Sequence, residues 1–309
     1  MINQFLSRHA TVFLAVSLFI GLIFPDLSEL LRPLLAPSVV ALLFLSLLQI
    51  DWQRVLYFVR RPLLLGPAML WLLVVSPIVM WWLVDATSLP IGIKVALVLM
   101  AAAPPTLSSP ALSQMIGLDG ALCLAMLGLA IIIMPVLLPP LSIEFLDLQL
   151  SMGTFELMTR LGVMIGGCLL AIFASRWIFG KARIDAHAGS ISSAALLALI
   201  IFAIAIMDGV AATFMDDPGH TLMVAGVAFA ANIGFQILGT VLFFASGRKI
   251  ALSVGFSCGN RNMGILLPAL PAAIWPDTLL FIAVLQFPIY MLPWLQKKLY
   301  WRLLGRGVI

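Results

Sequence analysis

Charged side chains are scarce in this chain of 309 residues: Asp, Glu, Lys and Arg make up 10% of it, and hydrophobic types make up 63%. Soluble domains carry about 25% charged residues, so this shortage excludes an ordinary soluble enzyme. The mean hydropathy of +1.16 points the same way. The composition therefore predicts an all-α polytopic membrane protein that forms one membrane domain over residues 1–309, with the lipid bilayer as its surroundings.

Cysteine is also rare, and catalytic motifs are missing. The three cysteines, Cys123, Cys168 and Cys258, all fall within apolar segments, so neither a disulfide framework nor a metal-ligand spacing is indicated. The chain contains no H-E-x-x-H and no G-x-S-x-G sequence, and the middle of its apolar segments holds no Asp or Glu. We therefore expect neither an enzyme nor a bound cofactor.

Ten apolar segments are long enough to cross a bilayer if tilt is allowed for. They lie at about 10–25, 34–50, 62–84, 89–116, 120–141, 155–179, 188–207, 220–246, 249–272 and 276–296. Threading them alternately places thirteen Lys and Arg residues on one side of the membrane and three, Arg32, Lys94 and Arg160, on the other. The positive-inside rule then predicts cytoplasmic termini in a plasma or inner membrane, and the net charge of +4 indicates topology and no nucleic-acid partner.

An internal repeat relates the two halves of the chain. When the sequence is shifted by 158 residues, 11 of the 28 positions from Pro110 to Leu137 are identical to those from Pro268 to Leu295, including two prolines and one aspartate. The first repeat covers about 1–141 and the second about 155–299. Each unit holds five predicted helices, an odd number, so the second enters the membrane in the opposite sense. This arrangement is typical of secondary transporters.

Two polar interruptions occupy matching places in the repeats. In residues 257–262, Arg261 lies about halfway along a predicted span, roughly 20 Å of helix from either edge. A charge at that depth costs about 3 kcal/mol and usually marks a site. The matching interruption, residues 104–110, holds prolines that disfavour a helix. We expect both helices to break, at Pro104, Pro105 and Gly259, and to cross, with a site made of Arg261, Asn260, Asn262, Thr106, Ser108 and Ser109.

Three further polar residues lie within apolar segments. Asn232 and Gln236 are one helical turn apart in the eighth segment, and Gln286 lies in the tenth. Such amides can face a transport cavity, or they can hydrogen-bond neighbouring helices. The sequence leaves both interpretations open.

The two interruptions resemble the bile acid:sodium symporter family, whose fourth helix carries G-G-T-A-S-N and whose ninth carries E-V-G-M-Q-N-S-G-L. Residues 104–109 match the first pattern at Thr106 and Ser108, and residues 257–265 match the second at Gly259, Asn262 and Gly264. The resemblance implies inverted five-helix repeats, a panel domain and a core domain, and crossed broken helices that hold sodium ions beside a pocket for an organic anion.

Several family sodium-ligand positions have changed in this chain. They correspond here to Ser257, Arg261, Ser109, Cys123 and Leu127. Most of the expected oxygen ligands are missing, so we expect no metal, and Na⁺ remains possible from the resemblance only. Our hypothesis is that the Arg261 guanidinium replaces sodium as a tethered cation. It would then either hold the crossed half-helices together or face the carboxylate of the substrate.

The sequence thus predicts a secondary transporter of a small organic anion that works by alternating access. One alternative is a sodium-dependent symporter in the family mode, and another is a non-transporting membrane receptor or sensor on the same fold. The sequence does not determine the substrate, the coupling ion, the direction of transport or the oligomeric state.

Overall fold

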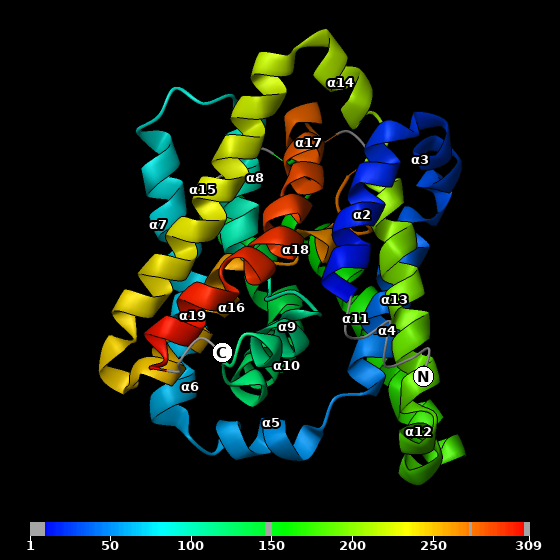
Figure 1. Ribbon diagram of the computed structural model, residues 1–309, viewed down its shortest axis with the longest axis vertical. Coiled ribbons are helices and arrows are strands. Elements are labelled where there is room, and N and C mark those ends of the chain that lie inside the picture. The colour runs from blue at the N-terminus through cyan, green and yellow to red at the C-terminus, as the bar shows by residue number, and fades with distance from the viewer. Residues whose placement is uncertain (1–9, 146–149, 272–273, 306–309) are drawn as a thin grey trace.

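The computed structural model describes residues 10–145, 150–271 and 274–305, and over these residues the chain is a bundle of helices without a β-strand (Figure 1). The predicted all-helical fold is confirmed. Both termini, which the charge distribution predicts to be cytoplasmic, lie outside the described residues together with Arg8 and Arg306.

The helices of the first half are α2 (Ala10–Ile23), α3 (Pro25–Leu31), η1 (Arg32–Leu34), α4 (Leu35–Leu48), α5 (Trp52–Val59), α6 (Pro62–Leu70), η2 (Trp71–Val75), α7 (Ser76–Asp85), α8 (Ile91–Ala102), α9 (Ser109–Met115), α10 (Gly120–Pro139) and η3 (Pro140–Phe145). Those of the second half are α11 (Thr154–Phe179), α12 (Lys181–Ala186), α13 (Ala188–Ala205), α14 (Val210–Asp216), α15 (Pro218–Leu242), η4 (Phe244–Ser246), α16 (Arg248–Gly259), η5 (Met263–Leu266), α17 (Pro276–Val284), α18 (Gln286–Leu295) and α19 (Lys297–Leu303). Segments η2 and η3 are π-helical.

Helix starts follow from local sequence. Asp51, Asp119 and Asp217 precede α5, α10 and α15, and each carboxylate accepts a hydrogen bond from a backbone N–H of the first turn. Pro62 and Pro276 open α6 and α17, where a missing N–H has no helical partner to lose. These residues fix where the helices begin.

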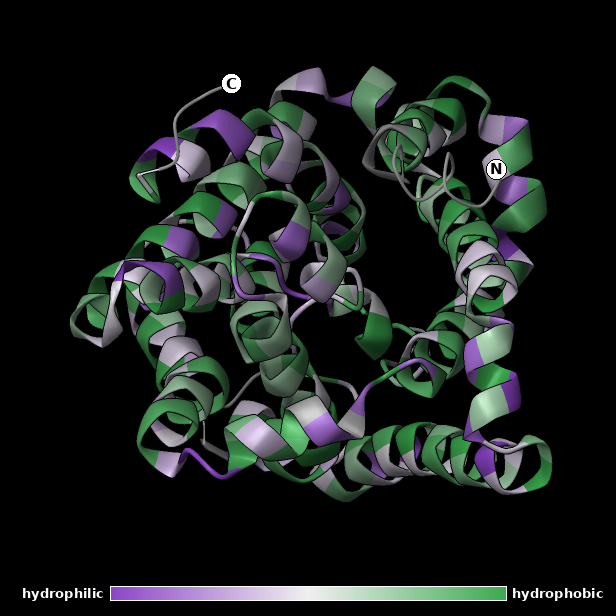
Figure 2. Ribbon diagram, turned by 60° about the horizontal axis from the view of Figure 1, so that its bottom comes forward, coloured by the Kyte–Doolittle hydropathy of each residue, from purple (hydrophilic) through white to green (hydrophobic). Residues whose placement is uncertain are grey.

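Seven helical stretches of the described residues are long and apolar enough to cross a membrane. They are Pro25–Leu48, Pro62–Asp85, Gly120–Glu144, Thr154–Phe179, Ala188–Asp216, Pro218–Leu242 and Pro276–Leu295. The other three predicted spans contain the shorter helices α2, α8 and α16. Helices α8 and α16 are short because each ends at an interruption. The helix ribbons are mainly hydrophobic in Figure 2. These features identify a helical integral membrane protein.

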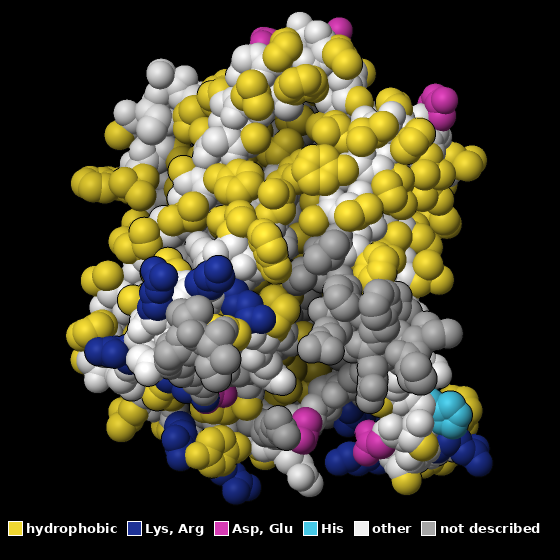
Figure 3. All heavy atoms as spheres, in the orientation of Figure 1, with side chains coloured by type: hydrophobic (Ala, Val, Ile, Leu, Met, Phe, Trp, Pro, Cys, Tyr) yellow, Lys and Arg dark blue, Asp and Glu magenta, His cyan; other side chains and the backbone are white. Residues whose placement is uncertain are grey.

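The outer surface is apolar around the middle of the molecule. In the middle of α11, Val163 is 69% exposed and Leu170 is 72% exposed, which water would disfavour and lipid would not. On the face seen in Figure 3, Lys and Arg side chains gather towards the lower end. In Figure 1, α12 lies at that end and α5 runs across it.

Helix packing separates the bundle into two parts. On one side α13 packs against both α2 and α4, and on the other α7 packs against α8, α8 against α17, and α15 along α16 (Figure 1). Helix α18 contacts both α2 and α15, and thus joins the two parts. The interrupted segments therefore belong to the part that contains α7, α8, α15 and α16.

Candidate functional site

Both polar interruptions are irregular backbone, and they pair with each other. Residues 103–108 separate α8 from α9, and residues 260–262 separate α16 from η5. The two strips run antiparallel: the Thr106 N–H donates to the Asn260 carbonyl at 2.9 Å, and the Asn262 N–H donates to the Pro104 carbonyl at 2.7 Å. This pairing satisfies backbone groups that would be costly to bury without partners.

The prolines explain the first interruption. Ala103 is extended, with φ −67° and ψ 152°, as expected for a residue before proline, and Pro104 and Pro105 have no N–H to continue the helix. The second interruption begins only after Gly259, which is the last residue of α16. Gly259 is needed for close packing: a Cβ there would collide with the backbone carbonyl of Asn232 in α15.

The Arg261 side chain is fully buried and points away from solvent into the helix crossing. Its Nε donates to the Cys258 carbonyl at 2.6 Å, Nη1 to the carbonyls of Ala103 at 2.8 Å and Leu72 at 3.0 Å, and Nη2 to Ser76 Oγ at 3.0 Å. All four partners are neutral oxygens, and the Phe235 ring lies 5.7 Å from the guanidinium carbon. The guanidinium thus joins α16, the first interruption and the η2–α7 segment.

The π-helical turn of η2 helps to supply these acceptors. A π-helical turn shifts the backbone hydrogen-bond register, and such turns often lie at functional sites. Here the Leu72 carbonyl in η2 accepts both from Arg261 and from Ser76 Oγ, which also contacts the Ala101 carbonyl at 3.0 Å. Ser76 is fully buried. The sequence analysis did not select it, although Ser76-Pro77 in an otherwise apolar span was an available signal.

Asn232 and Gln236 connect helices and do not face the pocket. Asn232 Nδ2 donates to the Gly259 carbonyl at 2.9 Å, and Gln236 Nε2 donates to Asn232 Oδ1 at 2.7 Å. The chain of bonds ends at Tyr300, whose hydroxyl donates to Gln236 Oε1 at 2.7 Å. Burial raises the pKa of Tyr300, which keeps this donor protonated. Of the two interpretations left open for Asn232, the structure supports the interhelical bond.

Asn232→Leu should destabilise the protein by about 1–3 kcal/mol, because it removes the donor to the Gly259 carbonyl and leaves Gln236 Nε2 without its acceptor. Thermal unfolding of the detergent-solubilised protein measures the effect. Thr159→Val is the control, because the exposed Thr159 hydroxyl bonds only within its own helix, to the Phe155 carbonyl. Equal melting temperatures for the two variants would contradict a structural role for Asn232.

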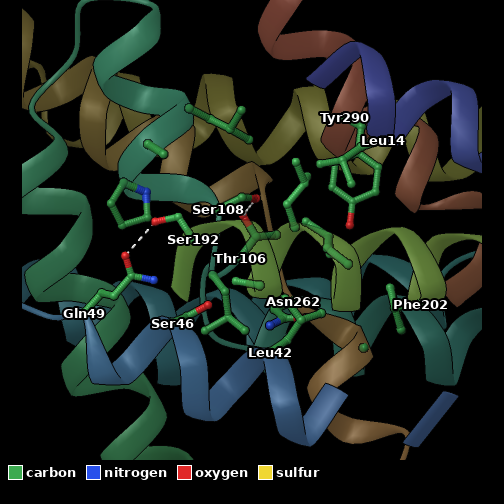
Figure 4. Close-up of a pocket in the computed structure, with 18 of the residues that line it drawn as sticks. Leu14, Leu42, Ser46, Gln49, Thr106, Ser108, Ser192, Phe202, Asn262 and Tyr290 are labelled. Atoms are coloured by element: carbon green, nitrogen blue, oxygen red, sulfur yellow. Dashed lines mark hydrogen bonds between the residues drawn. The ribbon is translucent and has the colours of Figure 1, made fainter. Parts of the chain in front are cut away.

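A cavity of about 550 Å³ adjoins the paired interruptions. Thr106, Ser108 and Asn262 line it from the crossing, and Gln286 and Tyr290 line it from α18 (Figure 4). The facing wall is formed by α4, the residue that follows it and α13, including Leu42, Ser46, Gln49, Ser192, Leu196, Leu199 and Phe202. The pocket thus lies between the two parts of the bundle and is amphipathic.

The pocket extends from the crossing towards one end of the molecule. Gln49 and Ile50 follow the end of α4, Ser192 and Ser193 lie in the first turns of α13, and Gln114 lies in the last turn of α9. In this region Ser192 Oγ donates to Gln49 Oε1 at 2.8 Å. The α4 C-terminus and the α13 N-terminus adjoin α5 and α12 in the chain, so this is the end where basic side chains gather in Figure 3.

The structure divides the predicted site residues into two groups. Thr106, Ser108, Asn262 and Gln286 line the pocket. The others, Arg261, Asn260, Ser109 and Asn232, are fully buried outside its lining. The sequence analysis did not select the lining residues Ser46, Gln49, Gln114, Ser192, Ser193 and Tyr290. Polar residues at the ends of apolar segments are too common to single these out from sequence.

Three buried oxygens beside the crossing make no hydrogen bond of ordinary geometry to the described residues. They are Ser109 Oγ, Ser257 Oγ and Asn260 Oδ1. Over the described residues, no group of three or more His, Cys, Asp or Glu side chains is placed to hold a metal ion.

No protein-family model matches this chain, and no curated protein matches it significantly.

Proposed function

We propose that this protein is a secondary transporter of a small organic anion, and that the pocket beside the paired interruptions is its substrate site. The observation that carries the proposal is the pairing itself: two irregular backbone strips, far apart in sequence, meet inside an apolar bundle beside an amphipathic cavity. Irregular backbone at membrane depth is tolerated only where it is enclosed by protein or lines a cavity, and in transporters it marks the binding site.

We further propose ten spans in two inverted repeats, and the register of the pairing supports this arrangement. Ala103 and Arg261, which the repeat superposes, contact each other directly through a hydrogen bond across 158 residues of sequence. Pro104 and Asn262, separated by the same interval, also bond to each other. Equivalent residues face one another when a two-fold axis passes between them, as an inverted repeat requires.

A second pair of hydrogen bonds supports the same symmetry. Ala101 and Gly259 are also 158 residues apart, and each lies in the last turn of the helix that precedes an interruption. The carbonyl of each accepts a side-chain bond from the preceding predicted span: Ser76 Oγ bonds to Ala101, and Asn232 Nδ2 to Gly259. The two halves thus stabilise their broken helices in the same way, with different residue types.

The basic end of the molecule is the proposed cytoplasmic end. The pocket extends towards that end, so the structure corresponds to an inward-facing state in this proposal. At the opposite end, Arg32 in η1 pairs with Asp208 at 3.1 Å, and deeper in the bundle the Phe19 and Phe287 rings pack at 5.4 Å. The Phe19–Phe287 contact joins α2 to α18 and would have to open in an outward-facing state, whereas the Arg32–Asp208 pair lies within the part that contains α13.

Arg261 gives a physical reason to expect transport without sodium. Its guanidinium already fills a cage of three carbonyls and a hydroxyl at the crossing, and a cation there would meet both charge repulsion and occupied ligands. A sodium-coupled mode remains the second candidate, and the unpaired oxygens of Ser109, Ser257 and Asn260 favour it.

Uptake into proteoliposomes distinguishes these candidates. Carboxylates that stabilise the purified protein against heat would be offered outside the vesicles, with sodium replaced by choline in parallel samples. We expect saturable uptake that choline leaves unchanged and that an imposed anion or proton gradient drives. Several-fold stimulation by sodium, lost in Ser257→Ala, would establish the sodium mode. Binding without any flux would instead indicate a receptor or sensor and would refute transport.

A further inference from the structure

We infer that the pocket selects a ligand with a single negative charge on an apolar body, and that Arg261 attracts this charge through the pocket wall without touching it. The inference concerns the ligand of the proposed transport site, so it rests on that proposal. It starts from an apparent mismatch: a site proposed for an anion has no cationic side chain in its lining.

The lining is electrically neutral. Among the described residues that form the pocket, none is Asp, Glu, Lys, Arg or His. Hydroxyl and amide groups of Thr106, Ser108 and Asn262 gather at the crossing, whereas Leu196, Leu199 and Phe202 present an apolar surface from α13 (Figure 4). Polar side chains also line the far end of the pocket, where Ser192 bonds to Gln49, so the crossing is the polar region that lies beside Arg261. A ligand whose polar group lies at the crossing would place its apolar body against Leu196, Leu199 and Phe202.

A net positive charge lies directly behind that polar end. The hydrogen-bond partners of Arg261 are three carbonyls and the Ser76 hydroxyl, so the guanidinium is well bonded and its charge is not neutralised by them. The residues on either side of it join it to the pocket: Asn262 lines the cavity, and the Asn260 carbonyl accepts from the N–H of Thr106, which also lines it.

Distance and burial set the size of the effect. Neighbouring Cα atoms are about 3.8 Å apart and the arginine side chain extends several Å further, so a carboxylate beside Asn262 would lie roughly 10 Å from the guanidinium. At that separation inside protein, one opposite charge strengthens binding by about tenfold. A second negative charge would lose its hydration in a neutral pocket and find no second cation, so a dianion should bind no better than the monoanion.

Matched ligands test this directly. The probes are triads, that is, sets of three ligands with the same apolar body, such as phenylpropyl, naphthyl or adamantyl. Within each triad one ligand carries a carboxylate, one the corresponding primary amide and one a malonate. Calorimetric binding to the detergent-solubilised protein requires no transport. We expect the carboxylate to bind about tenfold more tightly than the amide, and the malonate to bind no better than the carboxylate.

Ser76 allows the charge to be neutralised by a substitution outside the pocket lining. It contacts Arg261 Nη2 at 3.0 Å and does not line the cavity. Ser76→Asp places a carboxylate against the guanidinium, and Ser76→Asn is its neutral control of equal size. Ser76→Asn should still bind the carboxylate about tenfold more tightly than the amide. In Ser76→Asp the two affinities should be nearly equal. The same should hold for Arg261→Gln if it remains folded, as judged by gel filtration and thermal unfolding.

Salt provides an independent readout. In 0.5 M salt, where the screening length is about 4 Å, the carboxylate should still bind more tightly than the amide, because the Arg261 charge is buried. Attraction by the exposed basic residues would be screened out. A preference that disappears with salt, or survives equally in Ser76→Asp, would overturn the inference. So would an amide or malonate that binds best, or a complete lack of binding by every triad. Binding with the expected preference but without flux would refute transport and leave this inference intact.

Discussion

Arg261→Met should destabilise the protein by roughly 3 kcal/mol and abolish uptake. The substitution removes all four hydrogen bonds of the guanidinium and leaves irregular backbone carbonyls buried in an apolar bundle. Removing a buried charge is itself favourable and offsets part of this loss. The loss should prevail, because the acceptors are main-chain groups fixed by the crossing, and a methionine side chain cannot bond to them.

Arg261→Lys is the matched control for this prediction. Lysine keeps the charge, but its ammonium is a single point donor and cannot reach acceptors that lie in several directions from a planar guanidinium. We expect a melting temperature between those of the wild type and Arg261→Met. A methionine variant as stable as the wild type would show that the crossing does not depend on the guanidinium.

Gly255→Val should separate α15 from α16 and destabilise the protein by about 3 kcal/mol or more. A Cβ at Gly255 would collide with Thr240 Oγ1 and the Gln236 carbonyl, and would lie 2.9 Å from the Thr240 nitrogen. Two of the three obstacles are backbone atoms, so side-chain rotation cannot relieve the strain. A Cβ added at Gly239 would likewise lie only 2.9 Å from the Gly255 Cα, and thus the two helices pack through glycine on both sides.

Gly234→Ala in α15 is the control, because nothing lies within 4 Å of a Cβ built there. It should be neutral or slightly stabilising, since alanine loses less backbone entropy than glycine in a helix. Thermal unfolding in detergent and uptake in proteoliposomes measure both variants. If Gly255→Val unfolded at the same temperature as Gly234→Ala, close packing of α15 on α16 would not be required for stability.

The positions of the interruptions were predictable because their causes are local. Prolines at 104 and 105 prevent a continuous helix wherever they fall, and the asparagines flanking Arg261 break the apolar pattern in the matching place. The direction of the Arg261 side chain was not predictable. It depends on the Leu72 carbonyl and Ser76, which lie 189 and 185 residues away in sequence.

The roles of polar residues in apolar segments were likewise not predictable from the sequence. The sequence marked Asn232 and Gln286 alike, but Asn232 bonds to the end of α16, whereas Gln286 lines the pocket. Both are buried amides, and only the position of the neighbouring helices distinguishes them. The role of Gly259 was also predicted wrongly. It was expected to permit irregular backbone, but it is helical and is required for the close approach of α15.

The sequence by itself determined that this is a helical membrane protein with two polar interruptions, because composition and proline content act through local preferences and the solvent. Only the tertiary structure decided that the interruptions pair, that Arg261 bonds to carbonyls behind the pocket, and that neutral residues form the lining. These features depend on contacts between distant segments, and burying a guanidinium is tolerable only after the fold has brought its acceptors together.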